Sequence, residues 1–545
     1  MNFKNTKNLI KENFFSNIPQ DLVGGSTAAI VAIPIALAFG VASGLGPSAG
    51  LYGAIACGFF AAMAGGTPAQ VSGPTGPLTV VVAAMYAANP GRPDIVFSAI
   101  LIGGIFQIIL AKIKAGHLIE YIPYPVISGF MSGIGIIIII IQIPALLGQN
   151  STGNVLADLS TLPGTIMNAN IHALFTGIFT IVTVYLLPKL IKGIPAELTA
   201  LIIFTSIASY FSLQIPTIHE IPNQLPIPRI PELNLFEIQK VLIAAMTIAI
   251  LGSLDSLLTS LVADKATLTR PDSNQELIGQ GIGNIAASLV GGLPGAGATM
   301  RTMVNIRAGG KSRLSGIVHA FVIIAIVLAL GNLASKIPLA VLSGILIFVG
   351  LTIIDYRSLI NIRKTPMKDV AVMLLVLFLT VFVDLMIAVL VGVCLACTLF
   401  VKEVSDAQLS EHGHLDTLEH LIEVAAHLHP ETRKSIYTYT FNGPLFFGEV
   451  RNFHSAMKDV ETAKYITLRF TNVPIIDQSG ALALEEAEKI WQAKGAEILF
   501  IGIRPDIKKR LFDLGAIQSN DYCFRTLEEA VEYIDLQESA TRCTD

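Results

Sequence analysis

The stretch that decides the fold is "GGTPAQVSGPTGPLTVVV" (65–82), which has a partial counterpart in "GGLPGAGATMRTMV" (291–304). Both contain Gly-Gly-x-Pro, then small residues, then Thr, then an apolar run. Each is too rich in Gly and Pro for an ordinary spanning helix, and each continues as a short helix. Non-helical backbone at membrane depth is tolerated only where protein or a polar cavity covers it. We therefore expect two half-helices, beginning near 74–75 and near 298–299, whose N-termini point at each other.

The composition around these stretches is that of a membrane protein. Of 545 residues, 52% are hydrophobic and only 14% are charged, against roughly a quarter charged in soluble domains. The mean hydropathy is +0.65. Apolar runs long enough for full, tilted or half-length membrane helices occur in two sets of seven, near 21–42, 49–64, 74–88, 94–111, 119–147, 171–187 and 195–210, and near 237–262, 276–291, 297–306, 314–331, 337–353, 369–383 and 385–401.

The distribution of Lys and Arg predicts the orientation, because basic residues gather in cytoplasmic loops. With the N-terminus inside, the outer loops carry only Arg92, Arg229 and Lys336, and the inner loops carry Lys112, Lys114, Lys189, Lys192, Lys265, Arg270, Arg307, Lys311, Arg313, Arg357, Arg363, Lys364 and Lys368. An odd number of helices per half makes the second half enter the membrane inverted, as in many transporters. The fold class we expect is a polytopic α-helical protein of the inner (plasma) membrane with fourteen transmembrane segments in a 7+7 inverted repeat.

The two half-helix starts predict an anion site. Each helix N-terminus offers unpaired N–H groups and a partial positive charge of roughly half a unit. The residues at these starts are Thr75 and Gly76 in the first half, and Ala298 and Thr299 in the second. A simpler interpretation is that the glycines only allow close helix packing. That would explain one segment, but the same order recurs in both halves.

Asp255 is a carboxylate inside the apolar stretch that opens the second half. An ionisable group at this depth is costly and is by default a functional-site hypothesis. Thr259 lies four residues later on the same helix face, and hydroxyl, carboxylate and the free carbonyls of the unwound segment 295–298 are hard oxygen ligands suited to Na⁺. Binding of H⁺ is the alternative form of cation coupling. A structural alternative is that Asp255 simply pairs with Arg301.

Arg301 and a polar stripe on the next helix complete the candidate residues. Arg301 lies within the second half-helix, where its charge would favour an anion, a dianion above all; alternatively, it extends to a membrane interface. Glu276, Gln280 and Asn284 follow each other at spacings of four and form one polar stripe. This stripe is either part of a substrate pathway or an interhelical contact.

From about residue 402 the chain becomes polar. Residues 402–430 have the character of a linker, and residues 431–545 alternate strands with helices: strands within 435–448, at 465–470 and at 497–503, and helices at 481–495 and 526–535. This pattern predicts a small α/β domain. The domain organisation we expect is a cytoplasmic N-terminal segment (1–20), a transporter domain (21–401, with repeats at about 21–210 and 237–401), the linker, and the α/β domain on the cytoplasmic side.

Four motifs resemble the SulP (sulfate permease) anion transporters: "VSGPTGPLTVV" (71–81), "YIPYPVISGFMSGIGI" (121–136), "SNQELIGQGIGN" (273–284) and "GGLPGAGATMRTMVNIRAGG" (291–310). The resemblance implies a core and a gate domain, an elevator-like movement of the core, and a homodimer. In sodium-dependent bicarbonate transporters of this family, the matching anion positions are Thr75, Ala298 and Thr299, and the matching sodium positions are Asp255, Thr259 and Gly297. Arg301 departs from those transporters and matches sulfate-type and dicarboxylate-type relatives.

"NVPIIDQSGALAL" (472–484) resembles the STAS domain that follows the transporter in most SulP proteins. Ser479 matches the serine that is phosphorylated in related anti-sigma-factor antagonists, which makes it a possible regulatory site and the domain a possible docking site for a cytoplasmic protein. The alternative, which we favour from the sequence, is that Ser479 is only the N-cap of the following helix.

These features favour a secondary active transporter of sulfate or bicarbonate, coupled to Na⁺ or H⁺ and needing no other cofactor. An anion channel or an exchanger without cation coupling, and a dicarboxylate transporter, are the alternatives. A membrane-anchored signalling protein would explain the C-terminal domain only. No catalytic constellation or phosphate-binding loop is present, so we expect no enzyme, and nothing indicates a nucleic-acid partner.

Overall fold

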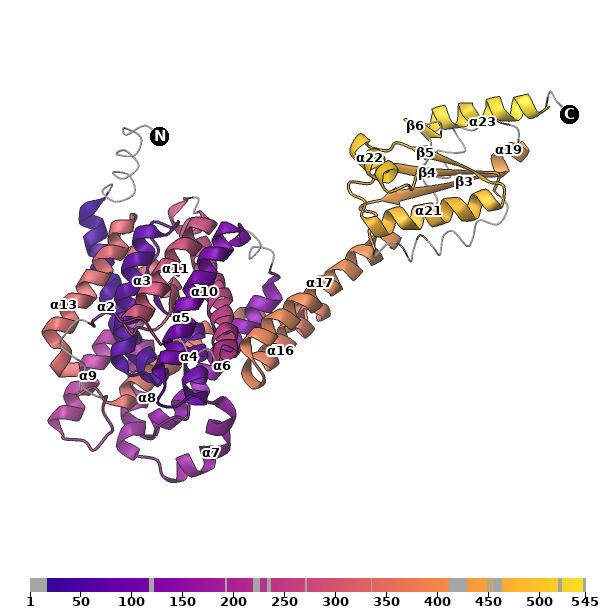
Figure 1. The fold of residues 1–545 in the computed structure, drawn as a ribbon. Helices are drawn as coiled ribbons and strands as arrows, with labels where there is room; N and C mark the ends of the chain where they lie inside the picture. The colour runs from indigo at the N-terminus through magenta and orange to yellow at the C-terminus, as the bar shows by residue number, and fades with distance from the viewer. Residues whose placement is uncertain are drawn as a thin grey trace, which may run out of the picture. The chain divides into compact units, whose positions relative to one another are not determined.

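The computed structural model describes residues 17–116, 122–191, 194–218, 226–232, 237–269, 272–334, 336–410, 428, 430–447, 450, 453, 463–517 and 522–542. They form two compact units, divided between residues 396 and 397 (Figure 1). Most of the predicted N-terminal segment and of the predicted linker lies outside the described residues.

The first unit is helical. Its first half comprises α2 (Ile18–Ala42), α3 (Pro47–Ala64), α4 (Gly76–Ala88), α5 (Pro93–Lys112), α6 (Tyr124–Leu146), α7 (Val155–Met167), α8 (Ile171–Leu190) and α9 (Ala196–Tyr210). Its second half comprises α10 (Ile238–Thr267), α11 (Ser273–Leu289), α12 (Thr299–Arg307), α13 (Arg313–Ala334), α14 (Leu339–Ile353), α15 (Tyr356–Ile360), the 3₁₀ turn η3 (Ile362–Lys364), α16 (Met367–Phe382) and α17 (Leu385–Ser410), the last of which continues past the division between the units.

A helix occupies each of the predicted apolar segments, and the polytopic helical fold is confirmed. Among the described residues, seven helices are long and apolar enough to cross a membrane. The count of fourteen spans therefore stays a prediction. The sequence did not indicate α7 or α15, which are short helices between the predicted segments.

Two short strands lie where the helices were expected to break. Strand β1 (Ser72–Pro74) precedes α4, and β2 (Gly295–Gly297) precedes α12. The strands pair antiparallel, with Gly73 opposite Ala296. The pairing satisfies backbone groups that a membrane interior would leave without partners, and it holds the starts of the two half-helices close together.

The packing of the helices has the exchange symmetry that an inverted repeat requires. If α2–α6 correspond in order to α10–α14, and α8 to α16, then each major contact has a counterpart in which the two halves have changed places. Thus α5 packs on α11 while α13 packs on α3; α5 packs on α10 while α13 packs on α2; and α6 packs on α16 while α14 packs on α8. The two halves are therefore interleaved rather than side by side.

Close helix contacts depend on glycine pairs. A Cβ placed on Gly104 of α5 would lie 2.6 Å from the Gly281 carbonyl oxygen of α11, and a Cβ on Gly281 would meet the Gly104 oxygen at the same distance. Gly135 of α6 and Gly350 of α14 make the same kind of reciprocal contact, at 2.6 and 2.9 Å. Helices in lipid approach through small residues because packing, not hydrophobic burial, joins them.

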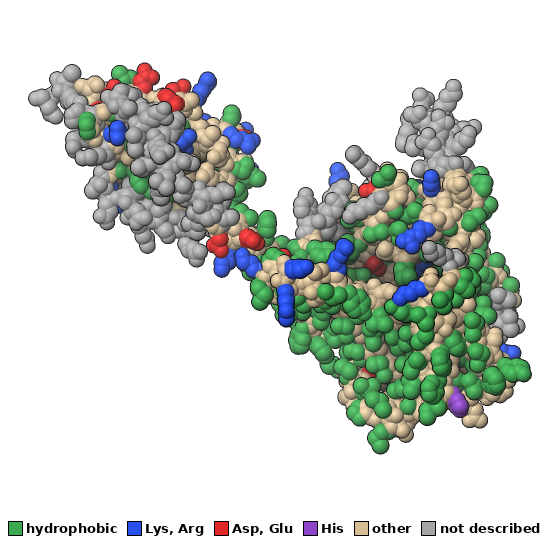
Figure 2. Space-filling view, turned by 180° about the vertical axis from the view of Figure 1, so that it is seen from behind, with side chains coloured by type: hydrophobic (Ala, Val, Ile, Leu, Met, Phe, Trp, Pro, Cys, Tyr) green, Lys and Arg blue, Asp and Glu red, His purple; other side chains and the backbone are tan. Residues whose placement is uncertain are grey.

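Basic side chains gather mainly at one end of the helical unit, and its flanks are covered with hydrophobic side chains (Figure 2). This distribution is what a multi-pass membrane protein needs, because the flanks face hydrocarbon and the basic end faces headgroups and water. The sequence predicted more Lys and Arg in the loops on one side of the membrane than on the other, and the surface of the helical unit agrees with this prediction.

The second unit is a small α/β domain. Strands β3 (Ile436–Asn442), β4 (Tyr465–Asn472), β5 (Glu497–Ile501) and β6 (Cys523–Phe524) form a parallel sheet in that order. The helices are α19 (Pro430–Lys434), α21 (Gln478–Ala493), α22 (Pro505–Asp513) and α23 (Leu527–Arg542). The predicted strands and helices are present; α19, α22 and β6 were not predicted.

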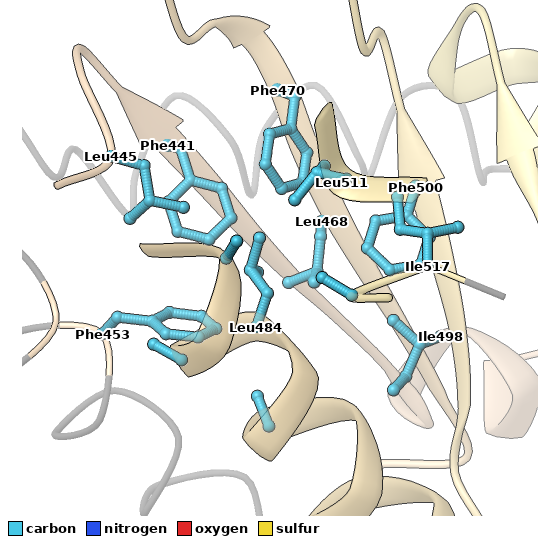
Figure 3. Packing of buried hydrophobic residues seen from close by; sticks show 14 of the residues in the cluster. Phe441, Leu445, Phe453, Leu468, Phe470, Leu484, Ile498, Phe500, Leu511 and Ile517 are labelled. Atoms are coloured by element: carbon cyan, nitrogen blue, oxygen red, sulfur yellow. The ribbon is translucent and has the colours of Figure 1, made fainter. Parts of the chain in front are cut away.

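Buried hydrophobic side chains that alternate in direction along the strands cover both faces of this sheet. Leu468, Phe470 and Phe500 belong to the cluster that packs against α21 and α22 (Figure 3). Leu499 and Ile501, from the intervening positions of β5, belong to the cluster that packs against α23. Successive side chains of a strand point to opposite faces, so the sheet is covered by helices on both sides, as parallel sheets require.

The N-cap of α21 is Asp477, and the expectation that Ser479 caps this helix is wrong. The Asp477 carboxylate accepts hydrogen bonds from the Gly480 N–H (2.8 Å) and the Phe447 N–H (3.0 Å). Ser479 is the second residue of the helix and is half-buried. The Asp477 carboxylate also ties the segment that follows β3 to the start of α21, through the Phe447 N–H.

We expect Asp477→Ala to destabilise this domain by about 1–2 kcal/mol, because it removes a helix cap and the tie to Phe447. Trp491 is the only tryptophan in the chain and is buried in this domain, so its fluorescence during urea unfolding measures this domain alone. Gln478→Ala, at an exposed position without a capping bond, is the matched control. Equal unfolding midpoints for the two variants would contradict the assignment.

Candidate anion and cation site

The two half-helices begin next to each other with uncapped N-termini. Thr75 is the N-cap of α4 and Ala298 is the N-cap of α12, and neither supplies a side-chain capping bond. The Thr75 hydroxyl is buried (the residue is 7% exposed) and has no hydrogen-bond partner in the described structure. First-turn N–H groups of a helix lack intrahelical acceptors. These starts therefore offer donors and positive potential to an anion.

A small pocket lies beside the first turn of α4. Its lining comes from α4, α6, α10 and α17 and from Ile122, two residues before α6: Pro77, Ile122, Val126, Ile127, Phe130, Met131, Leu251, Leu254, Asp255, Leu258 and Val389. Asp255 is the one charged side chain in this lining, and the others are apolar. Of the predicted site residues, Asp255 lines this pocket, and Thr75 lies next to the Asp255 carboxylate.

Three of the predicted site residues meet at the start of α12. The Thr259 hydroxyl donates to the Gly297 carbonyl oxygen (2.9 Å) and lies 2.7 Å from the Thr299 hydroxyl. The Ser256 hydroxyl, one turn earlier on α10, accepts from the Gly297 N–H (3.1 Å). These contacts attach α10 to the end of β2 and place several oxygens close together.

Asp255 lies one helical turn before Thr259, and one of its carboxylate oxygens has no hydrogen-bond partner. A carboxylate, two hydroxyls and a carbonyl are hard oxygen ligands, which are the kind that alkali and alkaline-earth cations take. The donor chemistry therefore fits Na⁺, and an unpaired carboxylate oxygen equally fits a proton. The residues that would hold the ion are Asp255, Thr259 and Gly297.

Arg301 does not face the pocket. It is 2% exposed, and its guanidinium donates to the carbonyl oxygen of Pro74, at the end of β1. Its other terminal nitrogen lies against Gly73 and has no hydrogen-bond partner. The alternative that Arg301 extends to a membrane interface is therefore wrong.

The alternative that Asp255 pairs with Arg301 is also wrong. Both residues are described, and no nitrogen–oxygen distance between them is within 4.0 Å, the limit for an ion pair. The two charges still influence each other through the low-dielectric interior. Arg301 thus adds positive potential near the paired strands. The expectation that Arg301 favours a dianion required direct contact between its guanidinium and the anion, and Arg301 does not line the pocket.

The polar stripe of α11 connects to the strands and their flanking loops. The Glu276 carboxylate accepts from the N–H groups of Gly66 and Thr67 (both 2.9 Å) and from the amides of Gln70 (2.8 Å) and Gln280 (2.7 Å). Because four donors from two segments converge on one carboxylate, Glu276 holds the chain that leads into β1.

Gln280 and Asn284 continue this contact. The Gln280 amide donates to the Ser72 hydroxyl (2.6 Å) of β1. Asn284 exchanges two hydrogen bonds with the backbone of Gly295 in β2 (3.0 and 2.7 Å) and donates to Gln107. All three stripe residues are buried and none lines the pocket. This geometry favours the interhelical alternative, and a role in a substrate pathway stays a prediction.

Sequence reasoning missed three buried polar residues of this region: Gln70, Ser256 and His319. Gln70 links Gly297 to Glu276, and Ser256 binds the Gly297 N–H. His319 of α13 is fully buried, and neither ring nitrogen has a hydrogen-bond partner in the described part of the chain. A single polar residue in an apolar helix gives no periodic signal, so the sequence did not indicate Ser256 or His319. Only the position of Gln70 within the "GGTPAQ" stretch could have indicated that residue.

Comparison with known proteins identifies both units. Residues 18–376 match the sulfate permease family, and residues 427–530 match the STAS domain. The chain belongs to the sulfate permease family. The bicarbonate transporter BicA of Picosynechococcus sp. is 38% identical over 539 residues, which cover 95% of each chain.

Two solved structures are similar to this chain. The transmembrane domain of a cyanobacterial bicarbonate transporter BicA has a TM-score of 0.65 and 44% identity, covering 69% of this chain and 98% of that one. The murine Solute Carrier 26 family member A9 anion transporter, in the inward-facing state, has a TM-score of 0.80 over 96% of this chain and 92% of that one, at 18% identity. The second likeness concerns the fold alone.

Family and relatives together show that this chain is a multi-pass membrane transporter of inorganic anions with a C-terminal STAS domain. It is a transporter and not an enzyme. The resemblance seen in the four sequence motifs is thereby confirmed.

We expect Gly297→Ala to reduce anion uptake at least about tenfold, the effect of a loss of about 1.4 kcal/mol in binding. The new Cβ would collide with the Gln70 amide nitrogen and lie 3.1 Å from the Thr259 Cβ, which would separate the oxygens gathered there. Uptake into proteoliposomes measures the effect. Gly164→Ala of α7, where a Cβ meets nothing within 4 Å, is the control. Normal uptake by Gly297→Ala would contradict the arrangement described above.

Proposed function

We propose that this protein is a secondary active transporter of bicarbonate coupled to Na⁺. The observation that carries the proposal is the position of Asp255: its carboxylate has an unpaired oxygen, lines the pocket beside the first turn of α4, and lies one turn from Thr259. A bound cation would neutralise Asp255, and the pocket would then present only positive helix ends and the Thr75 hydroxyl to an anion. Binding of each ion would favour the other.

Bicarbonate is the substrate we favour, for a chemical reason. Among the described residues, no cationic side chain lines the pocket, and Arg301 donates to Pro74 instead. A monovalent anion can be held by helix ends and a hydroxyl, whereas sulfate brings two charges and a larger dehydration cost. The relative with 38% identity is a bicarbonate transporter, which supports the same choice. Sulfate, after which the family is named, is the second candidate.

The proposed mechanism is elevator-like. The polar groups of the site come from α4, α10, α12 and the paired strands, whereas α6 and α17 contribute only apolar side chains to the pocket. Because the apolar wall formed by α6 and α17 holds no ligand, α4, α10 and α12 can carry the bound ions past it.

We further propose an inner-membrane location, a homodimer, and a cytoplasmic STAS domain that binds a protein partner, with Ser479 as a regulatory residue.

Uptake of radiolabelled bicarbonate and sulfate into proteoliposomes, with Na⁺ and H⁺ gradients imposed separately, tests this proposal. We expect saturable bicarbonate uptake that requires an inward Na⁺ gradient and exceeds sulfate uptake. Dependence on the H⁺ gradient alone would replace Na⁺ by H⁺. Saturable flux that needs neither gradient but requires anions inside would identify an exchanger, and non-saturating flux would identify a channel.

A further inference from the structure

The segment of residues 356–368, "YRSLINIRKTPMK", joins α14 to α16 and is called here the interface segment. It contains α15, the turn η3 and the first residues of α16. Both flanking helices are strongly apolar, and α14 is largely buried among other helices. A connection between two such helices lies at the boundary between hydrocarbon and water.

Four basic side chains of the interface segment are exposed: Arg357, Arg363, Lys364 and Lys368. None of them forms an ion pair with a described residue. The acidic residue just before the segment, Asp355, is already occupied by Tyr124, Ser128 and Ser358. Asp369, which follows the segment, is exposed and forms no ion pair with a described residue. The segment therefore presents four positive charges, none of them within ion-pair distance of a described carboxylate.

Large apolar side chains alternate with these charges. Ile360 is 78% exposed, Met367 is 79% exposed, and Tyr356 is 46% exposed. Such side chains are costly in water, but at the boundary of a bilayer they enter the acyl region while Lys and Arg side chains extend to the headgroups. An acidic protein surface would match the charges and would leave Ile360 and Met367 without an apolar environment.

We propose that the interface segment binds the phosphate groups of anionic phospholipids, with Ile360 and Met367 inserted beneath them. Each Lys or Arg near an anionic surface adds electrostatic attraction to such binding, and this attraction decreases within a Debye length. Guanidinium groups bind phosphate oxygens in bidentate fashion, which suits Arg357 and Arg363.

A rigid joint connects the interface segment to the pocket. Asp355 accepts hydrogen bonds from Tyr124 (2.8 Å) and Ser128 (2.7 Å) of α6, and its N–H donates to Ser132 (3.1 Å) of the same helix. Burial raises the pKa of the Asp355 carboxyl, but the hydrogen bonds from Ser358, Ser128 and Tyr124 outweigh burial and hold the pKa at about 2. The Asp355 carboxylate therefore stays charged at every physiological pH.

Helix α6 supplies Val126, Ile127, Phe130 and Met131 to the pocket. Lipid bound at the interface segment thus holds the apolar wall of the pocket in place, and anionic lipid increases the rate of anion uptake. This consequence rests on the proposed function, whereas lipid binding itself does not.

Thermal stability of the purified full chain in detergent tests binding directly. Phosphatidylglycerol should raise the temperature at which the monodisperse protein is lost, relative to phosphatidylcholine. The triple variant Arg363→Gln, Lys364→Gln, Lys368→Gln should need at least about tenfold more phosphatidylglycerol for the same shift. The triple variant Lys494→Gln, Arg504→Gln, Lys509→Gln removes three exposed charges of the STAS domain and is the matched control. An equal lipid requirement in wild type and interface variant overturns the proposal, and so does an equal loss in the control.

Uptake into vesicles of phosphatidylcholine with or without phosphatidylglycerol tests the consequence. We expect faster uptake with phosphatidylglycerol in wild type and control, and no lipid dependence in the interface variant. An interface variant that responds to phosphatidylglycerol as wild type does overturns the proposal. Absence of uptake in every vesicle contradicts the proposed function, and the thermal measurement then decides lipid binding separately.

Discussion

We expect Asp255→Ala to abolish cation-dependent accumulation of the anion. Within the described part of the chain, Asp255 is the one charged side chain that lines the pocket, and one oxygen of its carboxylate has no hydrogen-bond partner. Without it, the hydroxyls and the carbonyl of Gly297 keep their positions but have no negative charge with which to hold a cation. Loss of a charged ligand costs about 1.5–3 kcal/mol, which is roughly a 10- to 150-fold loss in cation affinity.

The measurement is uptake of labelled anion into proteoliposomes as the Na⁺ gradient is varied, with size-exclusion chromatography to show that the variant is folded. Asp384→Asn is the matched control, because Asp384 caps the start of α17 through the Ile387 N–H, and Asn can accept the same bond. Accumulation that still follows the Na⁺ or H⁺ gradient in Asp255→Ala would remove Asp255 from the coupling site.

Much of this fold could be predicted because two stretches break ordinary rules of membrane helices. A helix cannot continue through "SGPTGP" or "LPGAGA", and non-helical backbone is not stable in contact with lipid, so protein or a polar cavity had to cover these segments. Their pairing as β1 and β2 was not predicted. The start of α4 after Thr75 and of α12 after Ala298 follows from where the apolar run resumes. The contact between Thr259 and Gly297 was not visible in the residues alone and came from family resemblance.

The environment of Arg301 could not be predicted, because its partner exists only after the strands have paired. Pro74 ends β1, and its carbonyl oxygen accepts from a guanidinium 227 positions later in the chain. The same holds for the wall of the pocket: Phe130 of α6 and Val389 of α17 meet α10 only through packing between the two halves. Periodicity identifies the apolar face of each helix but not the helix that it contacts.

Two candidate N-cap residues at the start of α21 explain why the sequence led to the wrong cap. Asp477 and Ser479 are both good N-cap residues two positions apart, and the sequence does not say where the helix begins. The Phe447 N–H decides between them, because only the Asp477 carboxylate binds both that donor and Gly480.

Arg301→Gln should reduce bicarbonate and sulfate uptake by a similar factor, at least about tenfold for each, as expected for the loss of a charge-assisted hydrogen bond worth about 1.5–3 kcal/mol. Arg301 donates to Pro74 and does not line the pocket, so it acts on both anions through the same two effects. It fixes the residue that precedes Thr75, and it raises the positive potential behind the helix ends. Neither effect distinguishes a monoanion from a dianion by direct contact.

Arg301→Lys separates the two effects, because Lys keeps the charge but cannot reproduce the fork of the guanidinium. If potential dominates, Arg301→Lys retains most of the uptake; if the bond to Pro74 dominates, Arg301→Lys resembles Arg301→Gln. Both outcomes leave the ratio of sulfate to bicarbonate uptake close to that of wild type. A selective loss of sulfate uptake, with bicarbonate uptake maintained, would instead mean that the guanidinium leaves Pro74 during transport and contacts the substrate.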